Sequence, residues 1–344
     1  MQETNESIGP LTEASEWLAN FIWQDLASAV PHDLQWKIIL LTLVIAVGIF
    51  WVRGGRGSRG ADGRERKASL LQYLFPKDIY THISARVDVG LYLLERLLHP
   101  FWAVSLLATV GPATEQFTTE TLQFLLGASP ALQSNLGWML LYSLALLLAH
   151  DFSFFLIHYS MHKIPALWAL HKVHHSAEVL TPLTRYREHF LVGPLWASGA
   201  AIGYGFIAGI FSWLFNGGIT EATILSIGFF ALLFGFSGSF RHYHVQFRYP
   251  RWLEKWLQSP AMHHVHHSYL EKHWDTNMAA VTSIWDRMFG TLYIPEKDEP
   301  TPWGIGPDTQ ADYRSFSQNV TGPFRDWYQM LRKRFGSAVG GAEQ

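Results

Sequence analysis

Five long apolar stretches, separated by polar segments, run through this 344-residue chain. They are residues 36–52, 89–110, 136–157, 192–215 and 219–240. A helix needs about 20 apolar residues to cross the hydrocarbon core of a bilayer, and each stretch approaches or exceeds this length. The last two are divided only by Asn216-Gly217-Gly218, which is typical of a turn, so we expect a helical hairpin there. The pattern predicts an all-α, multi-span membrane protein with about four or five spans.

A basic, glycine-rich loop at residues 53–69 gives these spans an orientation. It carries six Lys or Arg residues against two Asp or Glu residues, and such loops stay on the cytoplasmic side of a membrane. Counting crossings from this loop places residues 158–189 and the chain after His242 in the cytoplasm. The second stretch contains Glu95 and Arg96, however, and the side would reverse if that stretch were a buried or re-entrant helix.

Composition agrees with a membrane protein and restricts its chemistry. Hydrophobic residues make up 49% of the chain and charged residues 16%, and there are 15 tryptophans, which suits a protein with much interfacial surface. The chain has no cysteine, so any metal must be bound by nitrogen or oxygen ligands. The formal net charge of −2 gives no overall basic field, and we therefore expect no nucleic-acid partner.

Histidine is concentrated in one part of the chain. Of the 17 histidines, 14 lie between residues 150 and 273. In the motif HYSMH, His158 and His162 are spaced i, i+4 and share one helical face, and Asp151 falls on the same stripe. Pro165 is expected to end this helix near Lys163 and to begin the next one, because proline is tolerated at the first helical position.

Two further motifs, HKVHH and HHVHH, repeat an HxxHH spacing on later segments. Each spacing places three imidazoles on one helical face. One more histidine follows the expected hairpin, at position 242. The candidate metal ligands are His158, His162, His171, His174, His175, His242, His263, His266 and His267.

This constellation favours a metal site over a packed core. Without a metal, any imidazole that became protonated would repel its neighbours, and each buried ring nitrogen would still need a partner. A metal cation binds the neutral ring and removes both problems. Nine candidates exceed the four ligands of a tetrahedral zinc ion and therefore predict two metals. Imidazoles suit iron, zinc, copper or nickel, so the ligand type does not identify the metal.

The three histidine motifs surround a membrane hairpin and are followed by WDRMFGT at residues 285–291. In this order they resemble the fatty acid hydroxylase and sterol desaturase superfamily, over residues 140–294. Its members are integral-membrane oxygenases that use O₂ and two electrons to hydroxylate or desaturate lipids. The resemblance implies a cytoplasmic helical cap that holds a dinuclear centre. It further implies two iron ions as cofactors, with zinc as an alternative in isolated protein, and O₂ as cosubstrate.

The resemblance also assigns residues by position. The HxxxH and two HxxHH boxes of the family fall on the three motifs, and the family's single histidine falls on His242, with His244 as a rival. Asn277, in Asp275-Thr276-Asn277, is expected to contact a metal or a ligating histidine. His189 partly matches a histidine found after the first HxxHH box. We expect Asp151 to accept a hydrogen bond from a histidine or to bind a metal directly.

These expectations divide the chain into four parts. They are a polar N-terminal segment (1–35), N-terminal spans with the basic loop 53–69 (36–135), a fatty acid hydroxylase-like catalytic domain (136–295) and a cytoplasmic C-terminal tail (296–344). The sequence shows no flavin motif and no cytochrome b5 module. Electrons are therefore expected from a separate redox partner, of the ferredoxin or cytochrome b5 type with its reductase.

The expected function is O₂-dependent C–H hydroxylation of a membrane lipid, either a fatty acyl lipid, a sterol or a related lipid. Desaturation of a lipid or sterol at the same site is the alternative. A membrane metal transporter ranks lower, because a transporter would need ligands near the bilayer midplane, whereas these motifs lie at helix ends. A membrane haem protein also ranks lower, because it needs only axial histidines that face each other across spans.

Overall fold

The computed structural model describes residues 36–53, 56–59, 65–67, 69–217, 240–296 and 299–339. These residues are mostly helical, as predicted, and the exception is a short antiparallel pair of strands, β1 (Arg56–Arg59) and β2 (Glu65–Lys67). The longer helices are α2 (Trp36–Val52), α5 (Ile83–Leu126), α6 (Leu136–Lys163), α7 (Pro165–His175), α8 (Val192–Phe215) and α14 (Phe316–Val339). The shorter ones are α3 (Leu70–Leu74), α4 (Lys77–Tyr80), η2 (Pro182–Tyr186), α10 (Arg251–Glu254), α11 (Pro260–His266), η3 (Glu271–His273), α12 (Ile284–Phe289), α13 (Pro307–Gln310) and η4 (Ala311–Tyr313).

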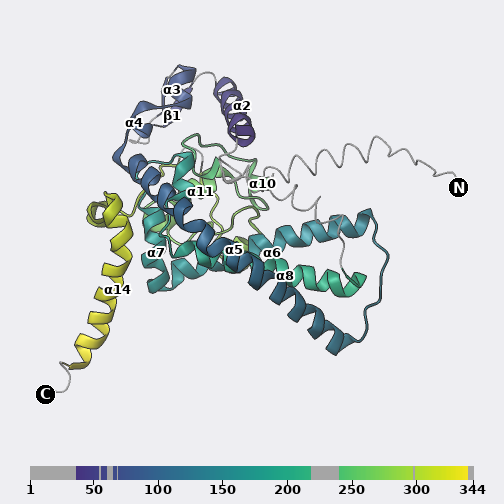
Figure 1. The fold of residues 1–344 in the computed structure, drawn as a ribbon. Coiled ribbons are helices and arrows are strands. Elements are labelled where there is room, and N and C mark those ends of the chain that lie inside the picture. Colours follow the sequence, from purple (N-terminus) through teal and green to yellow (C-terminus); the bar gives the residue numbers. More distant parts are fainter. Residues whose placement is uncertain are drawn as a thin grey trace.

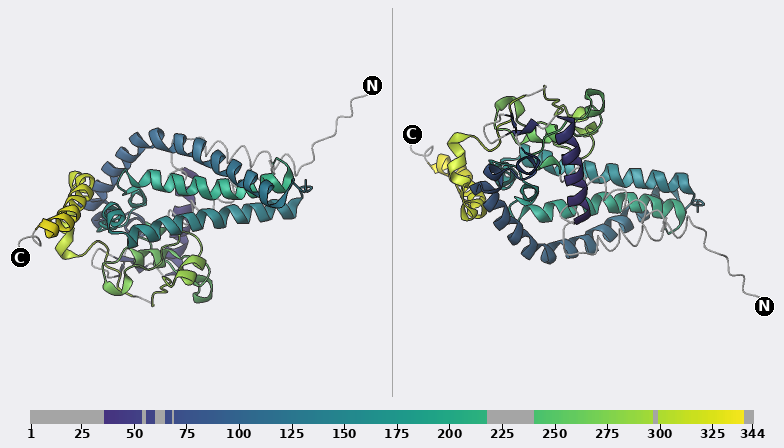
Figure 2. Two further views of the ribbon diagram at one scale, coloured as in Figure 1. Left: turned by 90° about the horizontal axis from the view of Figure 1, so that it is seen from below. Right: turned by 90° about the horizontal axis from the view of Figure 1, so that it is seen from above.

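Helices α5, α6 and α8 lie side by side and form an elongated bundle (Figures 1 and 2). The chain runs away from the histidine-rich end in α5, returns in α6 and leaves again in α8. Small residues allow α5 and α8 to approach closely. A Cβ atom on Gly205 would lie 2.4 Å from the backbone oxygen of Gly111, and one on Gly209 would lie 2.6 Å from that of Glu115.

Among the described residues, two helices are long and apolar enough to cross a membrane, at Leu136–Lys163 and Val192–Leu214. Only 28% of the apolar window is buried in each, whereas the core helix of a soluble protein would be mostly buried. This exposure indicates a membrane protein. The second arm of the expected hairpin, 219–240, lies almost wholly outside the described residues, as does the N-terminal segment 1–35. The number of spans and the cytoplasmic side of the histidines remain predictions.

The helix boundary predicted from Pro165 is confirmed. Helix α6 ends at Lys163, and Pro165 is the first residue of α7. A buried ion pair then fixes α7 against α5: the Arg187 guanidinium donates to Asp88 at 2.9 Å and to the carbonyl of Val173 at 3.0 Å. Both charged side chains are nearly inaccessible to water. The pair therefore fixes the position of the helix that carries three of the candidate ligands.

The remaining elements form a cap at one end of the bundle (Figure 2). It comprises α7, η2, α11, α12 and the loops between them, and α14 packs against α7. Asn216 ends α8 with a left-handed φ of 49°. The C-terminal tail, for which the sequence predicted only a polar segment, contains the long helix α14.

Candidate metal centre

The nine candidate histidines come together in two groups. His158, His162, His171, His175 and His266 form one group, called site A, and His174, His242, His263 and His267 form the other, called site B. Within each group, one ligand atom from every residue lies within 4.8 Å of all the others. The structure thus gathers the whole predicted ligand set, and no other predicted site residue belongs to either group.

Each HxxHH motif is divided between the two sites. On α7, His171 and His175 are spaced i, i+4 and belong to site A, while His174 belongs to site B. On α11 the division is reversed, because the i, i+4 pair belongs to site B and His266 to site A. The single helical face expected from the spacing is therefore split, and this split lets two short motifs supply two adjacent sites.

The ring nitrogens converge at distances that suit metal ligands. In site A, the Nε2 atoms of His158 and His171 are 2.9 Å apart. In site B, the Nε2 of His242 lies 3.2 Å from that of His174 and 2.9 Å from that of His263. Nitrogens bound to one tetrahedral metal at about 2.0–2.1 Å would be separated by about 3.3 Å. The two groups therefore fit two cations.

Unpaired nitrogens support the same conclusion. The Nε2 atoms of His162, His175 and His266 are buried in site A without a hydrogen-bond partner among the described residues. Burying such an atom unpaired is costly, and a cation would satisfy all three. In site B, burial lowers the pKa of His174 to about 3. That ring is consequently neutral near pH 7, which is the form that binds metals.

Residues 275–278, called the acceptor turn, hold three rings of site A. The Nδ1 atom of His162 lies 3.3 Å from a carboxylate oxygen of Asp275. The Nδ1 atoms of His266 and His158 lie 2.7 Å and 2.6 Å from the backbone oxygens of residues 276 and 278. Donation from Nδ1 leaves the Nε2 lone pair directed into the site, so the turn sets both tautomer and ring orientation.

Asn277 keeps this turn in place. Contrary to expectation, its hydrogen bonds within the described part of the chain do not include one to a candidate histidine ring. Its amide nitrogen donates to the carbonyls of Met262 and Tyr293, at 3.0 Å and 2.8 Å, and its amide oxygen accepts from the backbone N–H of Tyr293. Asp275 and Asn277 have left-handed φ values of 57° and 54°. Asp and Asn adopt this backbone more readily than other non-glycine residues, so their identities suit the turn, and the Asn277 amide holds it in place.

Asp151 also differs from the expectation. Its carboxylate accepts hydrogen bonds from the backbone N–H groups of residues 280, 281 and 282 and from the Thr282 hydroxyl, at 2.7–3.2 Å. These four bonds use both carboxylate oxygens on the segment after the acceptor turn. Asp286 of the WDRMFGT motif accepts from the N–H groups of residues 278 and 279. Both carboxylates thus support the turn and do not accept from the rings.

His189 and His244 lie outside both sites. The Nε2 of His189 is 3.1 Å from the carbonyl oxygen of Val320. The Nε2 of His244 is 2.8 Å from the carbonyl oxygen of Tyr73, which leaves His242 as the histidine of this segment in site B. Both residues lie outside the helices, and their hydrogen bonds to backbone carbonyls are made outside the two groups.

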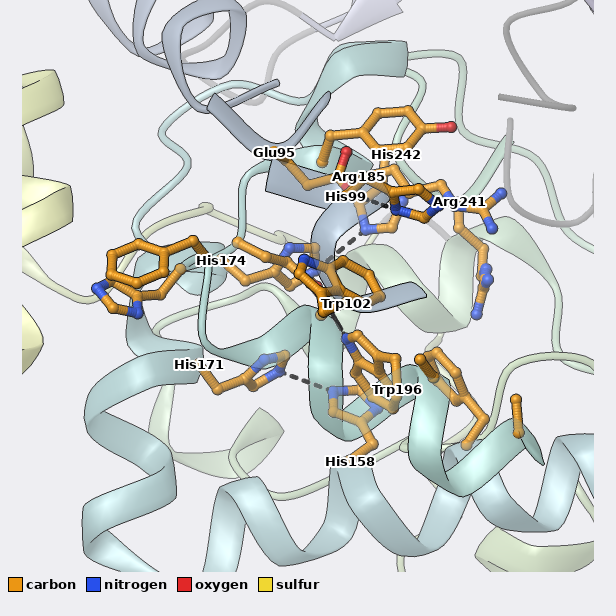
Figure 3. Close-up of a pocket in the computed structure, with 18 of the residues that line it drawn as sticks. Glu95, His99, Trp102, His158, His171, His174, Arg185, Trp196, Arg241 and His242 are labelled. Atoms are coloured by element: carbon orange, nitrogen blue, oxygen red, sulfur yellow. Dashed lines mark hydrogen bonds and ion pairs between the residues drawn. The ribbon is translucent and has the colours of Figure 1, made fainter. Parts of the chain in front are cut away.

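A pocket of about 410 Å³ borders both sites. Figure 3 shows His158, His171, His174 and His242 along it, with Trp102 and Trp196 beside them. The other walls come from α5, α6 and α8 and are mainly apolar, and Phe154 and Trp196 stack at 4.4 Å. His162, His175, His266 and His267 do not line the pocket. The pocket therefore reaches the sites from one side, between the helices of the bundle.

Several polar side chains of the pocket were missed in the sequence. They are Glu95, His99, Arg185, Glu188 and Arg241. His99 lies 2.9 Å from Glu95, one helical turn away. Burial raises the pKa of Glu188 to about 8, opposed by the Trp196 indole that donates to its carboxylate and reinforced by Glu95. Ionisable residues inside an apolar stretch are functional candidates by default, and this signal would have identified Glu95 and His99.

Comparisons with known proteins agree with this site. The family model named fatty acid hydroxylase matches residues 143–291, a range that contains both sites and the acceptor turn. An alkylglycerol monooxygenase from Xenopus tropicalis is 29% identical over 162 residues, covering 43% of this chain and 30% of that protein. The ornithine lipid hydroxylase OlsE from Rhizobium tropici is 26% identical over 197 residues, covering 54% of this chain and 52% of that protein.

The chain thus spans about a third to a half of the length of these relatives. No solved structure gave a significant match. The matched region carries all three histidine motifs in order, brought together in two groups, and the relatives are named as a monooxygenase and a hydroxylase. The family match and these relatives support the assignment of residues 143–291 to the fatty acid hydroxylase and sterol desaturase superfamily.

Proposed function

We propose that this protein is a membrane-bound, O₂-dependent lipid hydroxylase in which sites A and B each hold an iron ion. The observation that carries the proposal is the pocket, whose wall includes histidines of both sites and whose other walls are helices of the apolar bundle. Two bound iron ions would supply the activation of O₂ needed to hydroxylate an unactivated C–H bond. The chain's own residues bind the ions as neutral imidazoles and hold the substrate against them.

The pocket suits a lipid with a hydrocarbon chain and a polar head. Phe154, Trp196 and Tyr204 provide apolar surface along α6 and α8, so a chain would enter from the bilayer between these helices. Glu95 and Glu188 offer hydrogen-bonding partners for a head group. The relatives' names specify an alkylglycerol and an ornithine lipid, both of this general type. We therefore favour an acyl or alkyl lipid over a sterol.

Hydroxylation is favoured over desaturation because the named relatives are a monooxygenase and a hydroxylase. The transporter alternative has less support, since the histidines gather at the ends of α6 and α7 and in the cap. Electrons would come from a separate donor of the ferredoxin or cytochrome b5 type. By the positive-inside rule, the histidine end of the bundle would face the cytoplasm.

Lipid analysis under ¹⁸O₂ tests the proposal. Cells that express the wild-type chain should contain a lipid that carries one ¹⁸O atom, and cells with His174→Ala/His267→Ala should lack it. His82→Asn is the matched control, because His82 belongs to neither site and Asn retains an N-cap acceptor for α5. A new unsaturated lipid without ¹⁸O would instead indicate a desaturase. An unchanged lipid profile with altered cellular metal content would indicate a transporter.

A further inference from the structure

Helix α14 carries a stripe of apolar side chains that the described part of the chain leaves exposed. Phe324, Tyr328 and Leu331 are 43%, 66% and 55% exposed, and their i, i+4, i+7 spacing places them on one face of the helix. The neighbouring Trp327 is directed inward, where its indole donates to the carbonyl of Ala166 at 2.7 Å. One edge of the helix thus binds the cap, and the adjacent face presents large apolar groups to its surroundings.

The stripe lies at the level where two span helices reach the cap. Trp327 packs in a cluster with Met161, near the end of α6, and with Val192, the first residue of α8. The Phe324 ring lies 5.3 Å from that of His189 and 6.4 Å from that of Phe190, just before α8 begins. In Figures 1 and 2, α14 runs across the direction of α6 and α8. The stripe therefore adjoins the α8 side of the bundle, where a bilayer would begin.

Basic residues follow the stripe. Arg332, Lys333 and Arg334 are exposed at consecutive positions. The acidic residue of the same helix, Asp326, is turned inward and pairs with Lys172 of α7 at 2.6 Å. A helix with an apolar face bordered by basic side chains binds the boundary between lipid head groups and acyl chains, and anionic lipids strengthen this binding.

We propose that α14 is an interfacial helix that docks on the membrane surface through anionic lipid head groups. Phe324, Tyr328 and Leu331 enter the boundary region, and Arg332 and Arg334, which flank this stripe on the helix, contact the anionic head groups. Because Trp327 and Asp326 tie α14 to α7, docking also fixes the depth of the helix that carries His171, His174 and His175. The proposal concerns membrane contact and does not depend on the reaction catalysed.

The absence of cysteine from the chain allows a clean labelling experiment. Tyr328→Cys and Gln329→Cys place a single environment-sensitive fluorophore on the stripe and on a neighbouring exposed position that points elsewhere. The full chain is inserted into nanodiscs of phosphatidylcholine alone or with phosphatidylglycerol. Quenching is measured with doxyl-labelled lipids and with aqueous iodide.

In discs with phosphatidylglycerol, we expect doxyl quenching at position 328 to exceed that at 329 by at least about threefold, with the reverse order for iodide. The variant Arg332→Gln/Lys333→Gln/Arg334→Gln should remove the dependence on phosphatidylglycerol while keeping unfolding temperature unchanged. Equal iodide access at 328 and 329 in both disc types would overturn the proposal. Position 328 could instead be protected from iodide without being quenched by doxyl lipids. If this protection disappeared on dilution of the protein, a second copy of the chain would cover the stripe and the proposal would be wrong.

Discussion

Sites A and B share the two HxxHH motifs, yet the protein holds their rings differently. In site A, three of the five rings have an Nδ1 partner in the acceptor turn. In site B, the Nδ1 atoms of His242, His263 and His267 are buried with no hydrogen-bond partner in the chain as described. Partners at Nδ1 raise ligand basicity and fix the ring, so the comparison assigns site A the higher metal affinity.

The acceptor turn explains why the two sites differ. It contributes one side-chain oxygen and two backbone oxygens to site A. Asp151 and Asp286 accept from backbone N–H groups of the turn or of the segment that follows it, and Asn277, within the turn, binds the carbonyl of Tyr293. Polar residues from three separate parts of the chain thus support one group of ligands. Site B instead receives its rings from α7, α11 and the segment after the hairpin without comparable support. Its geometry therefore depends more on the bound ion.

Adjacent histidines provide the sharpest test of the comparison. His266 is the last residue of α11 and His267 follows it directly, but they belong to site A and site B. Replacing either with alanine should reduce the metal content of purified protein from about two ions per chain to about one, because each variant removes one ligand from one site. Elemental analysis measures the content. If one substitution emptied both sites, or neither, the separation into two sites would be wrong.

Competition with a chelator measures the affinity difference directly. Wild-type protein loaded with metal should lose its ions in two steps, and site B should release first, with an affinity about 10–100-fold below that of site A. The His267→Ala variant should retain only the ion of site A. It should release this ion at the chelator concentration at which the wild-type protein loses its second ion. Release of both ions in one step at one chelator concentration would show that the acceptor turn confers no advantage.

Substitution of Asp275 should reduce the difference in metal affinity between sites A and B. Its carboxylate faces His162 on one side and Lys163 at 2.5 Å on the other, and both lower the pKa of Asp275 to about 2. Asp275→Ala should weaken metal binding at site A by about tenfold and leave site B unchanged. Asp275→Asn retains a hydrogen-bond acceptor and should restore most of the affinity, as measured in the same competition. Equal weakening by both variants would mean that charge, and not ring orientation, is the relevant property.

The sequence was sufficient for the ligands and insufficient for their support. The three motifs identified eight of the nine histidines that gather in the structure, and the place after the expected hairpin identified the ninth, His242. Pro165 marked the boundary between α6 and α7. The partners of the rings could not be found in the same way, because His158 and Met278 are far apart in the chain and meet only after folding. A backbone oxygen also leaves no trace in residue identity. Asp151 and Asn277 were recognised as relevant, but their actual partners are backbone groups and, for Asp151, also the Thr282 hydroxyl.

Helix α14 was missed for a different reason. Gly322 and Pro323 resemble helix breakers, yet Pro323 lies inside the helix and a Cβ at Gly322 would be 3.0 Å from the Tyr313 ring. Tertiary packing therefore overrides the local preference at these positions. The spacing of Phe324, Tyr328 and Leu331 in the sequence matches a helical period and would have been the better guide.

The smallest effect is expected for Glu188, which lines the pocket but belongs to neither site. Glu188 has its pKa raised to about 8, from an ordinary value of 4.5, so the folded state holds a proton that the unfolded state releases. Its contribution to stability is therefore present below pH 4.5 and is lost as pH rises towards 8. Glu188→Gln should flatten this part of the stability profile in thermal unfolding between pH 5 and pH 8. Both metals should remain bound, because Glu188 belongs to neither group. A change in the release order of the two ions would instead link the pocket to the difference between sites A and B.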